Sequence, residues 1–436
     1  MTRPLLSAEW YRLRGLKPRL RGHVRTHRHV YRGRVWWVIE DRLGGTHHRF
    51  NAATHRVLEL MDGRRDMDTL WALLLEDLSD ETPTQDEIIH LLGQLHAADL
   101  VLADVTPDSA ELFERHSAHA RRRWLGRLGN PLALRFPLFD PDRLLQRILR
   151  RAGPLIGMPA LLLWLAVIVP ALVLLPSHWA ELGSNAMERL LSADSLVLMA
   201  LLFPLLKAVH EFGHALACRL RGGEVHEMGV MLLVLYPVPY VDVTSAGAFA
   251  SKWQRALVGA AGMLAELFVA ALAFYLWLVL EPGLARGLAY EVAVLASLMT
   301  LFFNANPLLR YDGYYILADL IECPNLAVRA NRYWRYLADR HLIGLPDAER
   351  PGDTPGERRW FVAYAPLSYA YRLFVSISVA LLVAHKLFVV GALLAIWAIA
   401  GGVVWPLLKG LRALFTAPRY AHRGTRIRAL LAGAVL

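Results

Sequence analysis

An apolar run at residues 195–220 carries the sequence His-Glu-Phe-Gly-His at positions 210–214. The run is long enough to cross a bilayer as a helix, and residues four apart in a helix lie on one face. His210 and His214 would therefore present two imidazoles side by side, an arrangement that can bind Zn²⁺ through neutral ring nitrogens. Histidine and glutamate are costly inside a membrane and rare there without a function. The pattern therefore predicts a metal site within a membrane helix, in preference to a polar packing cluster.

The chemistry of such a site needs a base and a third ligand. Glu211 lies beside the histidine pair and could act as general base on a zinc-bound water. Asp312 is the best candidate for the third protein ligand, in Asn-Pro-Leu-Leu-Arg-Tyr-Asp-Gly at 306–313. We expect the apolar helix before it, 288–309, to kink at Pro307 and to carry Asp312 at its end. An aspartate before a glycine is also common in turns, but the upstream histidine pair favours the ligand.

At these two motifs the sequence resembles the site-2 protease family, the intramembrane zinc metallopeptidases. That family pairs an HExxH helix with an NPxxxxDG segment on a later helix, and both motifs are intact within residues 195–325. The resemblance implies a peptidase whose cofactor is Zn²⁺. Carried over by matching positions, it gives the zinc ligands His210, His214 and Asp312, the catalytic acid/base Glu211, and Asn306 beside the bound peptide substrate.

One position departs from the family pattern. Many members have a GPxxN sequence on the intervening helix, where this chain has Gly-Met-Leu-Ala-Glu at 262–266. The departure leaves the substrate-positioning role of this helix open. Glu266 lies well inside the predicted span, so it is either a polar partner of the metal site or a structural hydrogen-bond anchor.

The whole chain has the composition of a polytopic membrane α-helical bundle. It has 436 residues, 55% hydrophobic, and a mean hydropathy of +0.32. Six apolar runs are predicted to span the bilayer, at residues 154–175, 195–220, 256–280, 288–309, 366–384 and 387–408. The net charge of +10 is explained by basic loops that obey the positive-inside rule. The same rule predicts that the N-terminus and the metal site face the cytosol of a bacterial inner or plasma membrane.

A further apolar segment, residues 228–241, should not span. Pro237 and Pro239 interrupt it, and proline removes a backbone donor that a membrane helix needs. A re-entrant loop or short hairpin beside the metal site would place a strand edge where a peptide substrate could pair. A packed connecting loop is the alternative.

Residues 1–104 are predicted to form a small cytosolic α+β domain of the winged-helix type. Residues 1–20 are basic and expected to be flexible. Short strands follow between 23 and 50, with a turn at Leu43-Gly44-Gly45. Helices are expected at 53–61 and 68–78, and a third begins at Thr84, where Glu87 completes a capping box. Residues 105–153 are expected to be a basic juxtamembrane linker that contains an in-plane amphipathic helix at 141–151. The polytopic domain then occupies 154–436.

This N-terminal pattern resembles PqqD-like domains, which recognise the leader peptides of ribosomally made, modified peptides. The resemblance implies an extended peptide added to a strand edge. DNA binding is the competing interpretation. The predicted third helix carries Gln85, Asp86 and Glu87 and no Lys or Arg, which is a poor face for phosphates, so we expect no nucleic-acid partner.

Two functions remain in competition. The first is a membrane-embedded zinc metalloendopeptidase that cleaves a membrane-associated or exported peptide or protein. The second is a non-proteolytic platform that hands a bound peptide to an export system, since some relatives with this domain pairing continue into an HlyD-type adaptor. Glu211 favours the enzyme, because a platform has no use for a general base. A membrane-tethered transcription regulator is a third interpretation, which the acidic third helix disfavours.

Overall fold

The computed structural model describes residues 6–416 apart from one long gap at 103–132 and the short gaps 8, 32, 42–45, 79–81, 99, 185–191, 234–235, 346–347, 349–350, 352–354 and 387. The chain divides into two compact units, residues 1–169 with 201–268, and residues 170–200 with 269–436. Helices α6 (Met158–Gly183), α8 (Ala193–Leu220) and α9 (Lys252–Val279) each contribute residues to both units.

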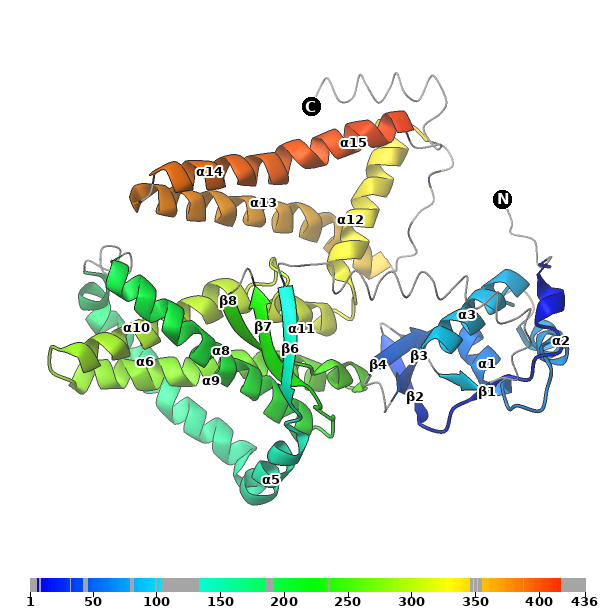
Figure 1. Ribbon diagram of the computed structural model, residues 1–436, viewed down its shortest axis with the longest axis horizontal. Coiled ribbons are helices and arrows are strands. Elements are labelled where there is room, and N and C mark those ends of the chain that lie inside the picture. The colour runs from blue at the N-terminus through cyan, green and yellow to red at the C-terminus, as the bar shows by residue number, and fades with distance from the viewer. Residues whose placement is uncertain are drawn as a thin grey trace. The chain divides into compact units, whose positions relative to one another are not determined.

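The first unit begins with a small α+β domain, blue to cyan in Figure 1. Its antiparallel sheet has the order β2-β3-β4, and among the described residues three helices and a two-stranded pair, β1 with β5, accompany it. The elements are β1 (Arg19–Leu20), β2 (Val24–Tyr31), β3 (Arg34–Asp41), β4 (Thr46–Phe50), α1 (Ala52–Leu60), α2 (Met67–Leu78), α3 (Gln85–Ala97) and β5 (Val101–Leu102). The predicted order of strands and then three helices is confirmed, whereas the winged-helix assignment stays a prediction.

Local signals account for the helices of this domain. The predicted capping box begins α3: Thr84 Oγ1 accepts from the Glu87 N–H at 3.3 Å, and Glu87 Oε2 accepts from the Thr84 N–H at 3.0 Å. Apolar residues at helical spacing, such as Leu70 and Leu92, are fully buried in the core. The predicted turn at Leu43-Gly44-Gly45 lies outside the described residues.

The expectation that residues 1–20 are flexible is wrong for the part of the segment that the structure describes. Trp10, Leu13 and Leu16 are buried in the domain core. The Trp10 indole N–H also donates to Asp68 Oδ1 at 2.7 Å. These apolar residues recur every third position, so they lie on one face of a short helical turn that packs against α2 and α3. The basic residues between them made this pattern easy to miss in the sequence.

A second sheet in the first unit joins segments far apart in sequence. β6 (Ala133–Phe139) pairs antiparallel with β7 (Met228–Leu233), which pairs with β8 (Tyr236–Val241), as Figure 1 shows. The segment 228–241 is therefore a hairpin, one of the two forms predicted for it. The predicted linker is partly regular structure, because β6 and the helix α5 (Asp142–Ala152) lie within it. Its composition did not reveal a strand whose partner follows some ninety residues later.

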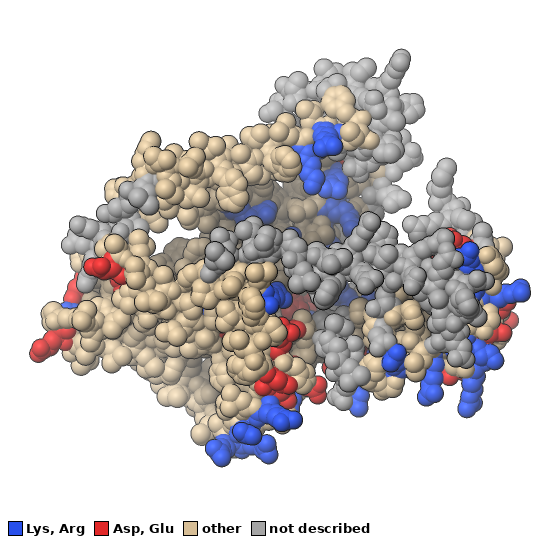
Figure 2. Space-filling model, in the orientation of Figure 1, with Lys and Arg blue, Asp and Glu red and all other residues tan. Residues whose placement is uncertain are grey.

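Helix α5 is strongly amphipathic, as predicted for residues 141–151. Leu145 is fully buried against α8, and Asp142 forms an ion pair with Arg219 at 3.2 Å. The opposite face carries the basic residues Arg143, Arg147, Arg150 and Arg151, and Figure 2 shows a dense basic surface over α5. A basic amphipathic helix of this kind is suited to lie in the plane of a membrane surface.

Among the described residues, six helices are long and apolar enough to cross a membrane, as the sequence predicts. They comprise residues Met158–Gly183, Ala193–Leu220, Lys252–Val279, Leu284–Asn304, Gly356–His385 and Phe388–Arg412. The fourth begins as α10 (Leu284–Leu298) and ends in a π-helical turn, Met299–Asn304. The sixth comprises α14 (Phe388–Ile399), a π-helical turn at Ala400–Val404 and much of α15 (Trp405–Thr416).

Two shorter helices, α11 (Asp312–Leu320) and α12 (Leu326–Leu337), follow the fourth span. In Figure 1, α12 crosses one end of the long helix α13 (Pro355–Lys386), which runs antiparallel to α14. Their common core includes Tyr314, Tyr333 and Phe361. Arg329 on α12 also binds the Glu357 carboxylate of α13 through both terminal nitrogens, at 2.8 and 2.6 Å.

Candidate metal centre

Helix α8 carries both predicted histidines in the first unit. His210 is fully buried and His214 nearly so, while Glu211 is partly buried. The four-residue spacing brings the two imidazoles together, as predicted: their Nε2 atoms lie 2.9 Å apart, with the ring planes at 76° to each other. Tetrahedral ligation with bonds of about 2.0–2.1 Å would place two such nitrogens roughly 3.3 Å apart. The pair is therefore within a few tenths of an ångström of ligand spacing.

The opposite ring nitrogens are each held by an acceptor on α9. His210 Nδ1 lies 3.1 Å from Glu266 Oε2, and His214 Nδ1 lies 2.7 Å from the Val258 carbonyl oxygen. A carbonyl and a carboxylate only accept, so each Nδ1 carries the proton in the neutral ring. Both Nε2 atoms then direct lone pairs toward the same point. The two Nε2 atoms lie within hydrogen-bond distance of each other, and a cation between them would be attracted to both lone pairs, so the donor set fits a metal.

These contacts explain the Glu266 position. Of the two roles left open by the sequence, the structure favours the polar partner, because the carboxylate is 2% exposed and faces His210. Metal-binding histidines commonly donate their second N–H to a carboxylate or a backbone carbonyl, which fixes the ring and its tautomer. Glu266 and Val258 provide one of each. The backbone acceptor was missed by sequence reasoning, because a carbonyl leaves no signal in side-chain identity.

A glycine keeps the space beside the two Nε2 atoms open. A Cβ built on Gly262 would lie 2.5 Å from His214 Nε2 and 2.7 Å from His210 Nε2, so any side chain there would occupy the position of a bound ion. Gly213 permits the close approach of the two helices, because its Cβ would lie 2.8 Å from the Ala261 carbonyl oxygen.

Glu211 is fixed by two further contacts. Its Oε1 lies 3.2 Å from Lys207 Nζ, one helical turn earlier, and its Oε2 accepts from the Val241 N–H at 3.2 Å. The second contact ties α8 to the hairpin strand β8. Sequence reasoning identified neither partner, although the four-residue spacing of Lys207 and Glu211 was a usable signal.

The same strand has an unusual outer edge. Alternate residues of a strand direct their backbone groups to the same side, so Pro237 and Pro239 share the side from which Val241 reaches Glu211. Neither proline has an N–H, and among the described residues β8 pairs with β7 alone. The outer edge of β8 therefore offers carbonyl acceptors at both prolines and no donor.

Asp312 lies in the second unit, where it is partly buried and is the first residue of α11. The prediction that it ends a kinked fourth span is wrong: that span ends at Asn304, and a separate helix begins at Asp312. Pro307 lies in the intervening turn, where Asn306 Oδ1 accepts from the Leu308 N–H at 2.9 Å. An asparagine side chain that accepts a hydrogen bond from the backbone two residues later stabilises a turn. The chain therefore leaves the helix here and does not bend within it.

The first unit thus holds a buried histidine pair arranged for a metal, on membrane-spanning helices, with a carboxylate beside it. This arrangement defines a candidate metalloprotein of the membrane. Residues 198–305 match the model of Peptidase family M50, the site-2 protease family. The matched region contains the histidine pair, Glu211 and Glu266, and ends before Asp312. No curated protein and no solved structure matches the chain.

The family match and the six apolar helices together indicate an integral, multi-pass membrane protein with metallopeptidase activity. Peptidases of this family are generally zinc-dependent. The chemistry of the donor set agrees with that dependence, because neutral imidazole nitrogens are common zinc ligands.

Proposed function

We propose that this chain is a zinc metalloendopeptidase of the site-2 protease type, which hydrolyses a peptide bond of a membrane-associated or exported substrate. The observation that carries the proposal is the convergence of the His210 and His214 Nε2 atoms, with each Nδ1 held by an acceptor. His210, His214 and Asp312 are residues of the right kinds for the ligand set, each offering one ligand atom. Zinc bound there would act as a Lewis acid and lower the pKa of a bound water.

Other residues of the chain would transfer the protons and orient the metal ligands. Glu211 takes a proton from the attacking water and later gives it to the leaving amine. Its contacts with Lys207 and with the Val241 N–H support this role, because they hold the carboxylate in one orientation beside the histidine pair. The Glu266 carboxylate and the Val258 carbonyl keep both imidazoles in the tautomer that a metal requires.

The β8 edge suggests how a substrate would be held. An extended peptide beside β8 would donate its own N–H groups to the carbonyls of Pro237 and Pro239 and receive none in return. Such one-sided pairing is weaker than a full strand addition, which suits a substrate that must also leave. Asn306 stays a candidate for contact with the bound peptide.

We also propose that the N-terminal domain recognises a peptide and raises its local concentration at the membrane. Among the described residues, β2 and β4 are the edges of its sheet, and α3 carries no Lys or Arg that would favour DNA. Deletion of residues 1–104 should abolish binding of the client peptide while the zinc content of the remaining protein stays normal. Unchanged peptide affinity after the deletion would reject this role.

The proposed activity is tested in cells that carry either the wild-type chain or Glu211→Gln. The substitution keeps the shape of the side chain and removes the base. Glu281→Gln, an exposed glutamate between two spans, is the matched control. We expect precursor peptides to accumulate with Glu211→Gln alone. Identical peptide pools in all strains, with export still dependent on the presence of the protein, would instead establish the non-proteolytic platform.

A further inference from the structure

The second unit contains a basic pocket that the proposed peptidase chemistry does not use. It is a shallow hollow that is partly open to its surroundings. Three segments line it: the turn before α11, helix α12 and helix α13. The polar or charged lining side chains are Arg310, Asn331, Tyr364, Ser368 and Arg372.

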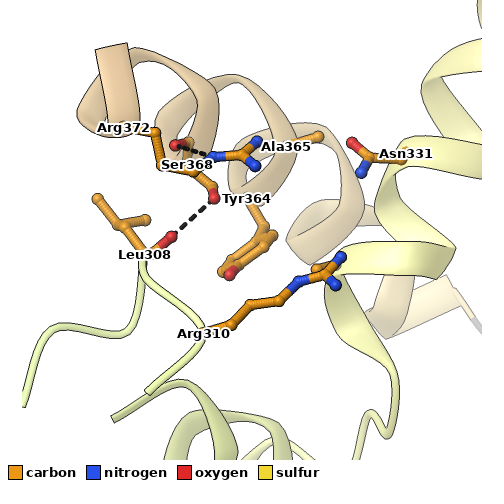
Figure 3. Close-up of a pocket in the computed structure, with 8 residues that line it drawn as sticks. Leu308, Arg310, Asn331, Tyr364, Ala365, Ser368 and Arg372 are labelled. Atoms are coloured by element: carbon orange, nitrogen blue, oxygen red, sulfur yellow. Dashed lines mark hydrogen bonds between the residues drawn. The ribbon is translucent and has the colours of Figure 1, made fainter. Parts of the chain in front are cut away.

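Two of these side chains carry the same charge. Figure 3 shows the guanidinium groups of Arg310 and Arg372 and the amide of Asn331 around one opening. None of the described residues that line the pocket carries a carboxylate. Two cations that face one hollow repel each other unless an anion lies between them. Arginine is also the side chain best suited to bind phosphate with two parallel hydrogen bonds.

The walls of the pocket are fixed by hydrogen bonds. Ser368 donates to the Leu308 carbonyl oxygen at 2.7 Å, and Tyr364 donates to the Pro307 carbonyl oxygen at 3.2 Å. Arg372 Nε donates to the Ser368 carbonyl oxygen at 3.1 Å, which orients the guanidinium and leaves its terminal N–H groups to face the hollow. The Arg372 guanidinium is therefore oriented before any ligand arrives, which lowers the entropy cost of binding.

The sequence of α13 indicates the depth of the pocket in a membrane. The tryptophan and the tyrosines of this helix all precede Arg372, whereas 373–384 has neither and is mostly aliphatic. Tyrosine and tryptophan concentrate at the level of lipid headgroups, and Arg372 lies where the aromatic stretch ends. A basic pocket beside a membrane helix at this level is suited to a lipid phosphate.

We propose that this pocket binds a phosphate group, supplied by the headgroup of an anionic phospholipid. The phosphate oxygens accept hydrogen bonds from the two arginines and from the Asn331 amide. The ligand would join α12 and α13 to the turn that precedes Asp312. This binding does not depend on peptidase activity, so its test stands apart from that of the proposed function.

The experiment uses the full chain, purified in dodecyl maltoside and examined by native mass spectrometry with added phosphatidylglycerol. Parallel samples receive phosphatidylcholine or inorganic phosphate. We expect phosphatidylglycerol adducts on the wild type, and binding weaker by about tenfold or more in Arg372→Gln and in Asn331→Leu, since each removes a hydrogen bond to a charged group. Arg359→Gln, an exposed arginine of α13 outside the pocket, should bind like the wild type.

Comparison of the samples with phospholipid and with inorganic phosphate shows which source of phosphate occupies the pocket. Adducts that need the lipid support the headgroup, whereas equal binding of inorganic phosphate supports a phosphate site filled by the free ion. Asn331 is exposed, so its variant tests the site even where Arg372→Gln does not fold. Lipid binding that is equal in the wild type, Arg372→Gln, Asn331→Leu and Arg359→Gln would overturn the proposal.

Discussion

The carboxylate of Glu266 on α9 lies 3.1 Å from Nδ1 of His210 on α8, and both side chains are buried. A charged group in a membrane-spanning helix is costly unless it has a partner. Here the partner is the imidazole that would bind the metal, so the contact gives Glu266 a role that its position in the sequence left open. The opposite nitrogen of that ring then remains a lone-pair donor for the ion.

Glu266→Gln is expected to weaken zinc binding without removing a ligand. The amide accepts a weaker hydrogen bond than the carboxylate, so His210 becomes less basic and less firmly oriented. Loss of such a partner typically costs about 10–100-fold in metal affinity. Competition with a chelator of known affinity measures the change. Glu291→Gln is the matched control, because Glu291 is also a buried glutamate of a membrane span but bonds Ser195; equal zinc affinity in both variants would refute the assignment.

Gly262→Ala is expected to abolish zinc binding. The added methyl group would lie 2.5–2.7 Å from the two Nε2 atoms and would exclude an ion from between them. Zinc content per protein, measured by plasma mass spectrometry, should fall toward zero. In Gly287→Ala the new methyl group meets no atom within 4 Å, so zinc content should be unchanged. Full zinc occupancy in Gly262→Ala would mean that the ion binds elsewhere.

Asp312→Ala tests the third ligand. Zinc held by two imidazoles alone should dissociate far more readily, so the zinc-to-protein ratio after gel filtration should drop. Asp319→Ala changes an aspartate two turns later on the same helix and should retain its metal. An unchanged ratio in Asp312→Ala would remove this residue from the ligand set.

His29 predicts a pH dependence of stability in the first unit. Its Nε2–H donates to the Ala248 carbonyl oxygen at 2.9 Å, which joins strand β2 to the 3₁₀ turn Thr244–Ala248. Burial lowers the pKa of His29 below 6.5 and outweighs the hydrogen bond, which raises it. The unfolded chain therefore binds more protons than the folded one, so stability is full above pH 6.5 and falls as the pH drops below it.

The loss can reach about 1.4 kcal/mol per pH unit. Thermal unfolding at pH 7.5 and 5.5 should show a larger drop for the wild type than for His29→Gln, which does not titrate. His341→Gln replaces an exposed histidine and should behave like the wild type. An equal pH response in His29→Gln and the wild type would contradict the role of this contact.

The features of the fold and site that could be predicted from sequence are those whose interacting residues lie close together in the chain. The pairing of His210 with His214 is set by the helical repeat, and the capping box of Thr84 and Glu87 lies within one turn, so both were predictable. The fourth span was misplaced at its end, because hydropathy alone does not show that Asn306 closes a turn before Pro307. The buried side chains of Trp10 and Leu13 were missed, because the arginines around them dominate the local composition.

The sequence by itself determined six apolar spans, the two histidines on one helix face and the carboxylate beside them, because hydropathy and helical periodicity are local properties. Only the tertiary structure decided that Glu266 and the Val258 carbonyl fix the two rings, that Gly262 leaves room for an ion, and that β6 joins the hairpin beside Glu211. Each of these contacts joins residues tens of positions apart. They depend on how helices and strands pack, and no local pattern specifies that packing.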